Sequence, residues 1–384
     1  MRAGARIWAL AVGQTLTYAG LYYCFAALLP ALEQAFGWTK AQLAAGPTLA
    51  FLVTALGTPL TGRLVDRGLG PLLLTALPAL GAVAIAGMSM AQAHWHWLAL
   101  WALVGVAQSG CLYETCFAVL IRDRGADTRP SITRITLVAG LASTLAFPLG
   151  HALAGALGGR GALLGFAALL LLGALPAHLF GTRGLGAAGG IPPRRGNLGR
   201  ALRQPAFWGM AAAFGLTYLN HLLVVTYALV LFGAAGGPAV WAASMIGPSQ
   251  VLGRLALMAA GLRLKNGVAL LMSLGAILLA AVMLALSGVA PALVLLTAAL
   301  QGAGMGVISI LRPVLQAELL GREGFGAISG AIAVAPILAT AAAPSLGALL
   351  LGLGGPGLLT LACGALAIAA LLLAQWLARM AART

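Results

Sequence analysis

Charged side chains are scarce in this sequence of 384 residues. Only 8% of the residues are Asp, Glu, Lys or Arg, whereas 61% are hydrophobic. A soluble fold cannot hide so much apolar surface behind so few ionic groups, so a disordered chain, a disulfide scaffold and a secreted enzyme are excluded. Long uninterrupted apolar runs also exclude an outer-membrane barrel, whose strands alternate apolar and polar residues. The composition therefore predicts an all-α protein that is integral to a membrane.

Enzyme motifs and metal-ligand patterns are absent as well. The sequence contains no Gly-x-x-x-x-Gly-Lys loop, no His-Glu-x-x-His motif, no Cys-x-x-Cys pair and no evident Ser/His/Asp set. Its four cysteines, Cys24, Cys111, Cys116 and Cys363, fall inside apolar segments, where a free thiol packs as a small hydrophobe. We therefore expect no enzymatic activity, no cofactor and no bound metal.

What the sequence does contain is a series of long apolar segments. A membrane-spanning helix needs about 20 residues, so twelve of them take about 240 and leave roughly 140 for loops and tails. Twelve segments meet this requirement: 7–35, 41–64, 71–92, 97–121, 132–156, 160–181, 205–232, 238–262, 267–288, 293–317, 325–350 and 356–378. The sequence thus predicts twelve transmembrane helices and leaves no room for a soluble domain.

Basic residues indicate the orientation of these helices. The net charge is +15, from 22 Lys plus Arg and 7 Asp plus Glu, but the basic residues form no patch with interleaved aromatics, so nucleic acid is not an expected partner. With the amino terminus inside, eighteen of the 22 fall in cytoplasmic loops and only Lys40 and Arg160 fall outside, as the positive-inside rule requires. Both termini are then cytoplasmic, and residues 94–97, His-Trp-His-Trp, form a short outer turn at the membrane interface.

A long polar stretch divides the chain near its midpoint. It contains Gly-Gly-Ile-Pro-Pro-Arg-Arg, and six predicted helices lie on each side of it. Two parallel six-helix pseudo-repeats would give this pattern, with a substrate site near the bilayer midplane. We expect an amino-terminal bundle over 1–183, a cytoplasmic hinge over 184–204 and a carboxy-terminal bundle over 205–384.

The loop after the second predicted helix carries a recognisable motif. Residues 62–68 read Gly-Arg-Leu-Val-Asp-Arg-Gly, which resembles the signature loop of the major facilitator superfamily. The resemblance implies that Gly62, Asp66 and Arg67 form an inner gate, in which glycine permits close helix approach and Asp66 faces a helix amino terminus. Gly70-Pro71 stands where the family often has glycine and two basic residues.

Three further segments resemble the branch of that superfamily that contains monocarboxylate porters and oxalate/formate exchangers. Residues 36–42, Phe-Gly-Trp-Thr-Lys-Ala-Gln, are similar to its aromatic-Gly-Trp-Ser/Thr opening, and 343–347, Ala-Pro-Ser-Leu-Gly, to its eleventh helix. Gly253-Arg254 resembles the pair that carries the carboxylate-binding arginine of this branch. The family acid four residues earlier is replaced by Gln250.

Two arginines lie inside predicted spans. An ionisable residue there costs about 2.5 to 3.5 kcal/mol to insert, so it should face a cavity or a partner. Arg254 lies one turn after Gln250, and the two could receive a carboxylate; the alternative is a structural ion pair with Glu114. Arg312 follows Ser309 on one face of its helix, and we weigh substrate binding against snorkelling or pairing with Glu318.

Two other ionisable residues could carry a proton. Glu114 is the only acid firmly inside a span, and a desolvated carboxylate takes up a proton readily; the alternative is a permanent salt bridge to Arg254 or Arg134. His221 lies near the middle of its predicted helix and titrates near neutrality when unperturbed, although a neutral hydrogen-bonded histidine is as common.

Aromatic side chains complete the set of candidate substrate-binding residues. Gln14, Tyr18 and Tyr22 recur at spacing four on one helical face, where they could close over a ligand or act as interhelical glue. Tyr113 precedes Glu114, and Tyr227 is the counterpart in the second half.

These observations together predict a secondary active transporter of the bacterial inner membrane. Two arginines against one glutamate favour a small organic anion, a carboxylate carried with protons by alternating access. An exporter of a larger amphipathic drug or metabolite is the alternative within transport, and a membrane sensor or accessory subunit is the alternative outside it. The expected partners are a small-molecule substrate, protons and the lipid bilayer, and the expected state is a monomer.

Overall fold

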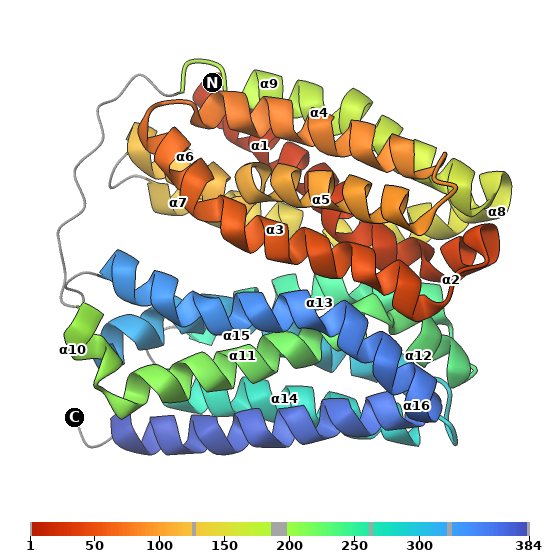
Figure 1. Ribbon diagram of the computed structural model, residues 1–384. Coiled ribbons are helices and arrows are strands. Elements are labelled where there is room, and N and C mark those ends of the chain that lie inside the picture. Colours follow the sequence, from red (N-terminus) through yellow and green to blue (C-terminus); the bar gives the residue numbers. More distant parts are fainter. Residues whose placement is uncertain (1, 125–127, 186–197, 261–263, 321–324, 382–384) are drawn as a thin grey trace. The chain divides into compact units, whose positions relative to one another are not determined.

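The computed structural model describes residues 2–124, 128–185, 198–260, 264–320 and 325–381. Every regular element in these ranges is a helix (Figure 1). Nine helical stretches among the described residues are long and apolar enough to cross a membrane. Two of them, Arg134–Gly181 and Ala331–Met380, contain 48 and 50 residues, more than twice the length of about 20 that one span requires. The predicted all-helical, multi-pass membrane protein is confirmed.

The chain folds as two compact units, Met1–Ile191 and Pro192–Thr384. The division falls inside the polar stretch 184–204, of which residues 186–197 lie outside the described part of the chain. Each unit has a hydrophobic core of its own. In the first, the core includes Ile7, Leu10 and Leu74, and in the second it includes Phe214 and Leu311.

The first unit consists of consecutive helices with two π-helical segments, labelled η. Their bounds are α1 Arg2–Thr17, η1 Tyr18–Tyr23, α2 Cys24–Phe36, α3 Lys40–Asp66, α4 Gly70–Met88, α5 His94–Cys111, α6 Tyr113–Arg124, α7 Thr128–Ala139, α8 Ala142–Leu169, η3 Leu170–Ala174 and α9 Leu175–Gly181. Helix α5 packs against α3 and α4, α8 against α2, and α1 against α7 and α9.

The second unit contains fewer and longer helices. Their bounds are α10 Leu198–Leu202, α11 Pro205–Thr226, α12 Ala228–Ala234, α13 Ala239–Ala260, α14 Asn266–Leu286, α15 Leu293–Leu320 and α16 Phe325–Ala381. Helix α11 packs along α16, and α15 packs against α13 and α14. Helix α16 passes through Gly354 and Gly355, which have non-helical backbone angles, so its 57 residues form two helices across a kink.

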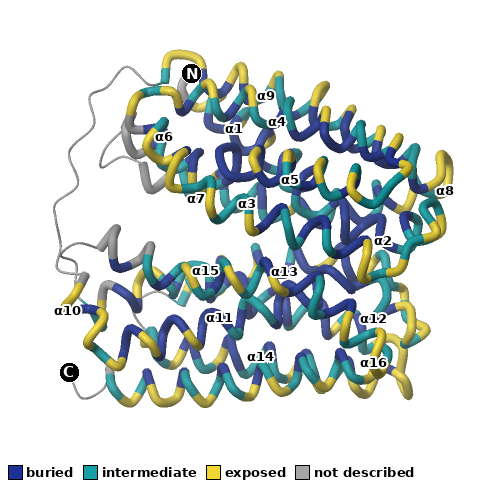
Figure 2. Tube along the Cα trace, viewed as in Figure 1, coloured by how far each residue is buried: buried dark blue, intermediate teal, exposed yellow. Residues whose placement is uncertain are grey.

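Large apolar side chains remain exposed on both units. Exposed positions recur along the helices in Figure 2, and they include Leu56, Leu172 and Leu361, which are 81%, 80% and 70% exposed. A soluble protein rarely exposes so much apolar surface, whereas lipid tails cover it at no cost. The four cysteines are buried as free thiols, in agreement with the prediction.

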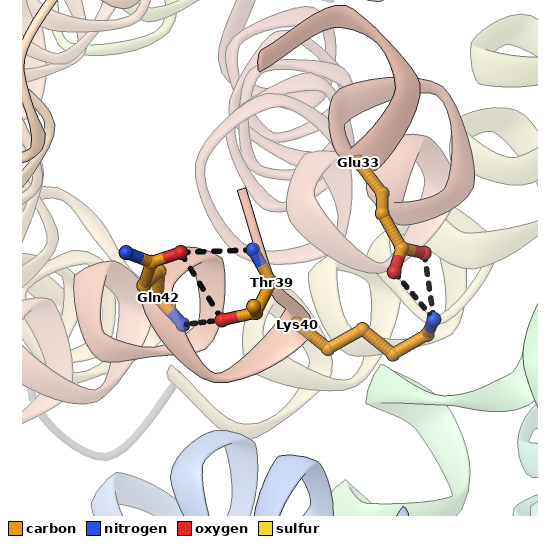
Figure 3. Close-up of polar contacts among 4 residues, drawn as sticks. All are labelled: Glu33, Thr39, Lys40 and Gln42. Atoms are coloured by element: carbon orange, nitrogen blue, oxygen red, sulfur yellow. Dashed lines mark hydrogen bonds and ion pairs between the residues drawn. The ribbon is translucent and has the colours of Figure 1, made fainter. Parts of the chain in front are cut away.

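The corner between α2 and α3 shows how the sequence ends one helix and starts the next. Gly37 ends α2 with φ of 66°, a conformation that glycine adopts without strain. Thr39 and Gln42 then form a reciprocal capping box at the start of α3 (Figure 3). Beside them, the Lys40 ammonium lies 2.6 Å from the Glu33 carboxylate. The segment 36–42 is therefore a tightly specified turn.

Residues 94–97, predicted to form a short turn, are instead the first turn of α5, and their location on the outer side stays a prediction. Trp97 packs inside the protein rather than on its surface. Its ring is fully buried, its Nε1 donates to the Leu43 carbonyl at 3.0 Å, and it packs against Trp101 with ring centroids 5.8 Å apart. The indole binds α5 to α3, since a buried N–H needs an acceptor and that carbonyl supplies one.

One predicted continuous helix, 132–156, is interrupted at residues 140–141, between α7 and α8. Two further predicted helices are interrupted as well. Segment 97–121 breaks at Leu112, whose backbone is extended, and α6 begins after it. Segment 205–232 breaks at Tyr227, between α11 and α12. Both interruptions lie beside candidate site residues.

Candidate functional site

Three tyrosines of the first unit lie on the π-helical segment η1. Residues 19–21 form its buried side, and Tyr18, Tyr22 and Tyr23 are partly exposed. The ring centroids of Tyr18 and Tyr22 are 5.8 Å apart, and those of Tyr22 and Tyr23 are 5.1 Å apart. In an α-helix, a residue five positions on is rotated by about 140°. The i→i+5 pattern of a π-helix reduces this rotation, so the three rings share one face.

The break at Leu112 brings a fourth tyrosine to this face. Tyr113 is the first residue of α6, and its ring centroid lies 4.5 Å from that of Tyr18. It also stacks on Phe117, one turn further along α6, at 5.1 Å. Phe51 of α3 packs against Tyr22 at 5.4 Å. Elements α3, η1 and α6 thus contribute to one aromatic cluster, which we define as Tyr18, Tyr22, Tyr23, Phe51, Tyr113 and Phe117.

Glu114 lies beside this aromatic cluster in the first turn of α6. Its side chain is exposed, and it directly follows Tyr113 of the aromatic cluster in the sequence. The helix amino terminus favours a negative charge at this position. Among the described residues of its own unit, no basic side chain forms an ion pair with Glu114, so a salt bridge to Arg134 is not present.

Gln14 is fully buried and contacts the backbone beside the break at Leu112. Its Nε2 donates to the carbonyl of Cys111, the last residue of α5, at 2.9 Å. Gln108 makes a parallel contact, because its Nε2 donates to the Leu21 carbonyl of η1 at 2.8 Å. Both amides satisfy backbone carbonyls of interrupted helices, which places Gln14 as interhelical glue rather than on the aromatic surface.

The loop motif at 62–68 ends α3 with a tight backbone turn. The Arg67 N–H donates to the Arg63 carbonyl and the Leu69 N–H to the Leu64 carbonyl, while Gly68 has φ of 89°. The expected close approach at Gly62 is not present inside its own unit, where a Cβ on that glycine would meet open space.

Close packing in this loop occurs instead at a later glycine. A Cβ on Gly70 would collide with Val119 of α6, so this position keeps α4 against α6. Arg67 is exposed, and the side chain of Asp66 lies outside the described residues. The motif's inner-gate role therefore stays a prediction.

The candidate anion site of the second unit centres on Arg254 of α13. This arginine is 9% exposed, and its Nε donates to the Ser309 hydroxyl of α15 at 3.3 Å. Ser309 in turn donates to the Gly306 carbonyl at 2.6 Å. Gln250, one turn earlier on α13, is 8% exposed. The structure thus places Arg254 and Gln250 together on the helix pair α13–α15.

Glycines let these two helices meet backbone to backbone. A Cβ on Gly302 would collide with the Ile246 carbonyl, and a Cβ on Gly306 with the Gln250 carbonyl. Gly253 of α13 meets α15 in the same way. Glycines at spacing four are the signature of tightly packed membrane helices, so the close approach that brings Ser309 to Arg254 is encoded in the sequence.

Arg312 lies one turn beyond Ser309 on α15. Its guanidinium carbon is 5.5 Å from the centroid of the Tyr218 ring on α11, within the range of a cation–π contact. Glu318 accepts a hydrogen bond from the Asn266 amide at 3.0 Å. Among the described residues, no ion pair joins Arg312 to Glu318, so the predicted alternative finds no support at this position.

His221 belongs to a buried polar network in the second unit. The Gln301 amide nitrogen donates to Asn220 Oδ1 at 2.9 Å and lies 3.5 Å from His221 Nδ1. Asn220 then donates to the Cys363 carbonyl at 2.7 Å. Because these groups contact α11, α15 and α16 at once, the network joins three helices, and the hydrogen-bonded alternative for His221 fits this geometry.

Tyr227 is fully buried at the break between α11 and α12. Its hydroxyl donates to the Pro344 carbonyl of α16, and its ring fills the space beside Gly347. Pro344 and Gly347 belong to the segment 343–347 that resembles the family's eleventh helix. The structure therefore gives Tyr227 a packing role and does not bring it to the Arg254 site.

Sequence reasoning missed one buried histidine. His178 of α9 is fully buried, and its Nε2 lies 3.2 Å from the Thr17 hydroxyl of α1. Its ring occupies the space beside Gly13, where a Cβ would come within 2.8 Å of the imidazole. The signal that selected His221, an ionisable residue inside an apolar segment, applies equally to His178.

A comparison with known proteins agrees with this architecture. The Major Facilitator Superfamily profile matches residues 10–335. A 38 kDa protein in the 23S RNA operon of Thermoproteus tenax, itself uncharacterized, is 29% identical over 250 residues, which cover 62% of this chain and 62% of that protein. The chain thus matches less than two thirds of the length of this relative.

Two solved structures share the fold. A bacterial homolog of the human lysosomal transporter Spinster, in an inward-facing and occupied conformation, is 14% identical, with a TM-score of 0.73 over 98% of this chain and 96% of that one. The nucleoside transporter NupG, as a mutant, is 13% identical, with a TM-score of 0.74 over 98% and 99%. Because the family profile covers most of the sequence, the chain belongs to the Major Facilitator Superfamily and has the fold of its transporters.

Proposed function

We propose that this protein is a secondary active transporter of a small organic anion, a carboxylate, across the bacterial inner membrane. In this proposal the chain forms twelve transmembrane helices with both termini in the cytoplasm. Six-helix bundles over 1–183 and 205–384 are joined by a cytoplasmic hinge over 184–204, and the protein works by alternating access as a monomer. The eighteen-to-two distribution of basic residues supports the orientation.

Arg254 carries the assignment of an anionic substrate. It is nearly buried within an apolar helix, and a guanidinium at such depth needs an anionic or polar partner. Its Nε donates to the Ser309 hydroxyl, and a guanidinium is the side-chain group that binds a carboxylate as a bidentate fork. Gln250 supplies an amide one turn away. This arrangement also supports the resemblance of Gly253-Arg254 to the monocarboxylate and oxalate/formate branch.

Glu114 is the proposed proton carrier. Its carboxylate is exposed, so it is accessible to a proton from water that enters the transporter. His221 is the second candidate, although its contact with Gln301 ties it to a structural network. We therefore assign coupling to Glu114 first.

Ligand binding to purified full-length protein tests the anion site. Organic acids are screened by thermal shift, since a ligand at 100 times its dissociation constant stabilises a protein by about 2.7 kcal/mol. The affinity of the best anion should fall from wild type to Arg254→Lys and further to Arg254→Gln, by roughly 10- to 150-fold in the latter. Arg203→Gln, which removes an exposed arginine, is the matched control and should bind normally.

Transport in vesicles completes the test. Labelled anion should enter protein-reconstituted vesicles, and a proton gradient should drive its accumulation. Unchanged anion affinity in a folded Arg254→Gln protein would remove this arginine from the site. Stabilisation by hydrophobic drugs alone, without any anion, would contradict the proposal in favour of an exporter of amphipathic compounds.

A further inference from the structure

Four of the six tyrosines in the chain, Tyr18, Tyr22, Tyr23 and Tyr113, gather in the first unit with Glu114 beside them. We propose that the aromatic cluster and Glu114 form a binding site for the cationic group of an organic ligand, an alkylated ammonium. The proposal goes beyond anion transport and does not rest on Arg254.

The solvent exposure of the residues in α6 and η1 shows that the tyrosines are not simply part of the hydrophobic core. In α6, positions 115, 116, 119 and 120 are buried, whereas Tyr113, Glu114 and Phe117 are not. In η1, the small and aliphatic residues 19–21 are buried and the tyrosines are partly exposed. Aromatic rings that served only to fill a core would show the opposite arrangement. Both elements therefore present rings and a carboxylate on their unburied sides.

Charge and ring geometry both select a cation. Aromatic faces carry negative potential and attract ammonium groups within about 6 Å of a ring centroid, and alkylated ammonium ions are the ligands that tyrosine-rich cages recognise. Glu114 adds a carboxylate beside the rings, because it directly follows Tyr113, whose ring centroid lies 4.5 Å from that of Tyr18. A carboxylate inside an apolar segment needs a partner, and no described residue of its own unit supplies one as an ion pair. A ligand cation fills that role.

The same carboxylate cannot hold a proton and a cation at once, because protonation removes its charge. Proton uptake and cation binding at Glu114 therefore exclude each other, whichever way the substrate moves. This exclusion keeps the inference compatible with Glu114 as proton carrier.

Calorimetric titration of the full-length protein in lipid nanodiscs tests the site, with choline as the probe. The neutral tert-butyl analogue of choline has the same shape without the charge, and it should bind at least about tenfold more weakly. Glu114→Gln should lower choline affinity by about 10- to 100-fold. Tyr18→Leu should lower it about tenfold, whereas Tyr18→Phe, which keeps the ring, should retain most of it.

Two controls make the outcome decisive. Trp95→Leu removes an aromatic ring that is 66% exposed at the start of α5 and should leave choline binding unchanged. Arg254→Gln should also leave it unchanged, so failure of the anion proposal and failure of this one are distinguishable. Absence of choline binding by the wild-type protein would overturn the inference. Equal affinity for choline and its neutral analogue, or normal choline binding by a folded Glu114→Gln protein, would do the same.

Discussion

The rings of Tyr18 and Tyr113 lie 4.5 Å apart between centroids, at an angle of 40°, although they belong to different helices. Each ring owes its position to a departure from regular α-helix: Tyr18 opens the π-helical segment η1, and Tyr113 follows the extended residue Leu112. Irregular backbone inside a membrane helix leaves unpaired carbonyls that must find partners. Gln14 and Gln108 provide these partners, so the departures are supported features of the fold.

Replacing Glu114 by Gln should separate coupling from substrate exchange. The variant lacks the group that takes up a proton, so accumulation driven by a pH gradient should be abolished. Exchange of labelled for unlabelled substrate needs no net proton movement and should continue. Both rates are measured in the same reconstituted vesicles. Normal accumulation by Glu114→Gln would transfer the coupling role to His221.

Single cysteines should report the predicted orientation. A cysteine at Ala188, in the proposed hinge, should react with a membrane-impermeant maleimide only from the cytoplasmic side, and one at Ala93 only from outside. The native cysteines are buried, so they should contribute little background. Ala188 itself lies outside the described residues. Labelling of both positions from one side would contradict the twelve-helix topology.

Gly306→Ala should destabilise the second unit. The added methyl group would meet the Gln250 carbonyl of α13, and overpacking of this kind costs about 1 to 3 kcal/mol. Gly275→Ala is the matched control, because a Cβ there meets open space and alanine favours the helix by up to about 1 kcal/mol. Thermal unfolding of the two variants should therefore shift in opposite directions. Equal melting temperatures would show that α13 and α15 separate more easily than their contact indicates.

Tyr227→Phe should affect stability and leave ligand affinity unchanged. The variant removes the hydrogen bond from the tyrosine hydroxyl to the buried Pro344 carbonyl, and one such bond contributes about 0.5 to 1.5 kcal/mol. Tyr218→Phe, which keeps the ring beneath Arg312, is the matched control and should melt near the wild-type temperature. Reduced anion affinity in a stable Tyr227→Phe protein would instead support the substrate-binding role that the sequence suggested.

The positions of the membrane helices can be predicted from the sequence, whereas the breaks within them cannot. Apolar runs must be helical in lipid, so helix positions such as α14, at Asn266–Leu286, agree closely with the predicted segment 267–288. The breaks at Leu112 and Tyr227 carry no such signal, since leucine and tyrosine are both compatible with a helix. Their irregular backbone depends on contacts with other helices, which a single sequence does not reveal.

The candidate site shows the same division. Arg254 can be predicted from the sequence because it lies deep inside an apolar segment. Gly302 and Gly306, at spacing four, indicate the tightly packed helix pair around it. The sequence shows Ser309 only as a neighbour of Arg312. Its hydrogen bond with Arg254 depends on how α13 and α15 are rotated about their axes, which the sequence does not reveal. Gln14 appeared with the tyrosines by spacing, and the π-helical turn then separated their faces.

The backbone contact between α13 and α15 also has a mechanical meaning. Glycine surfaces that interdigitate resist sliding, because any shift along the helix axis would drive a carbonyl of one helix into the chain of the other. We therefore expect α13 and α15 to behave as one rigid helix pair. Because Arg254 and Ser309 lie on this helix pair, we expect them to move together as one rigid body and to keep their hydrogen bond when the protein changes conformation.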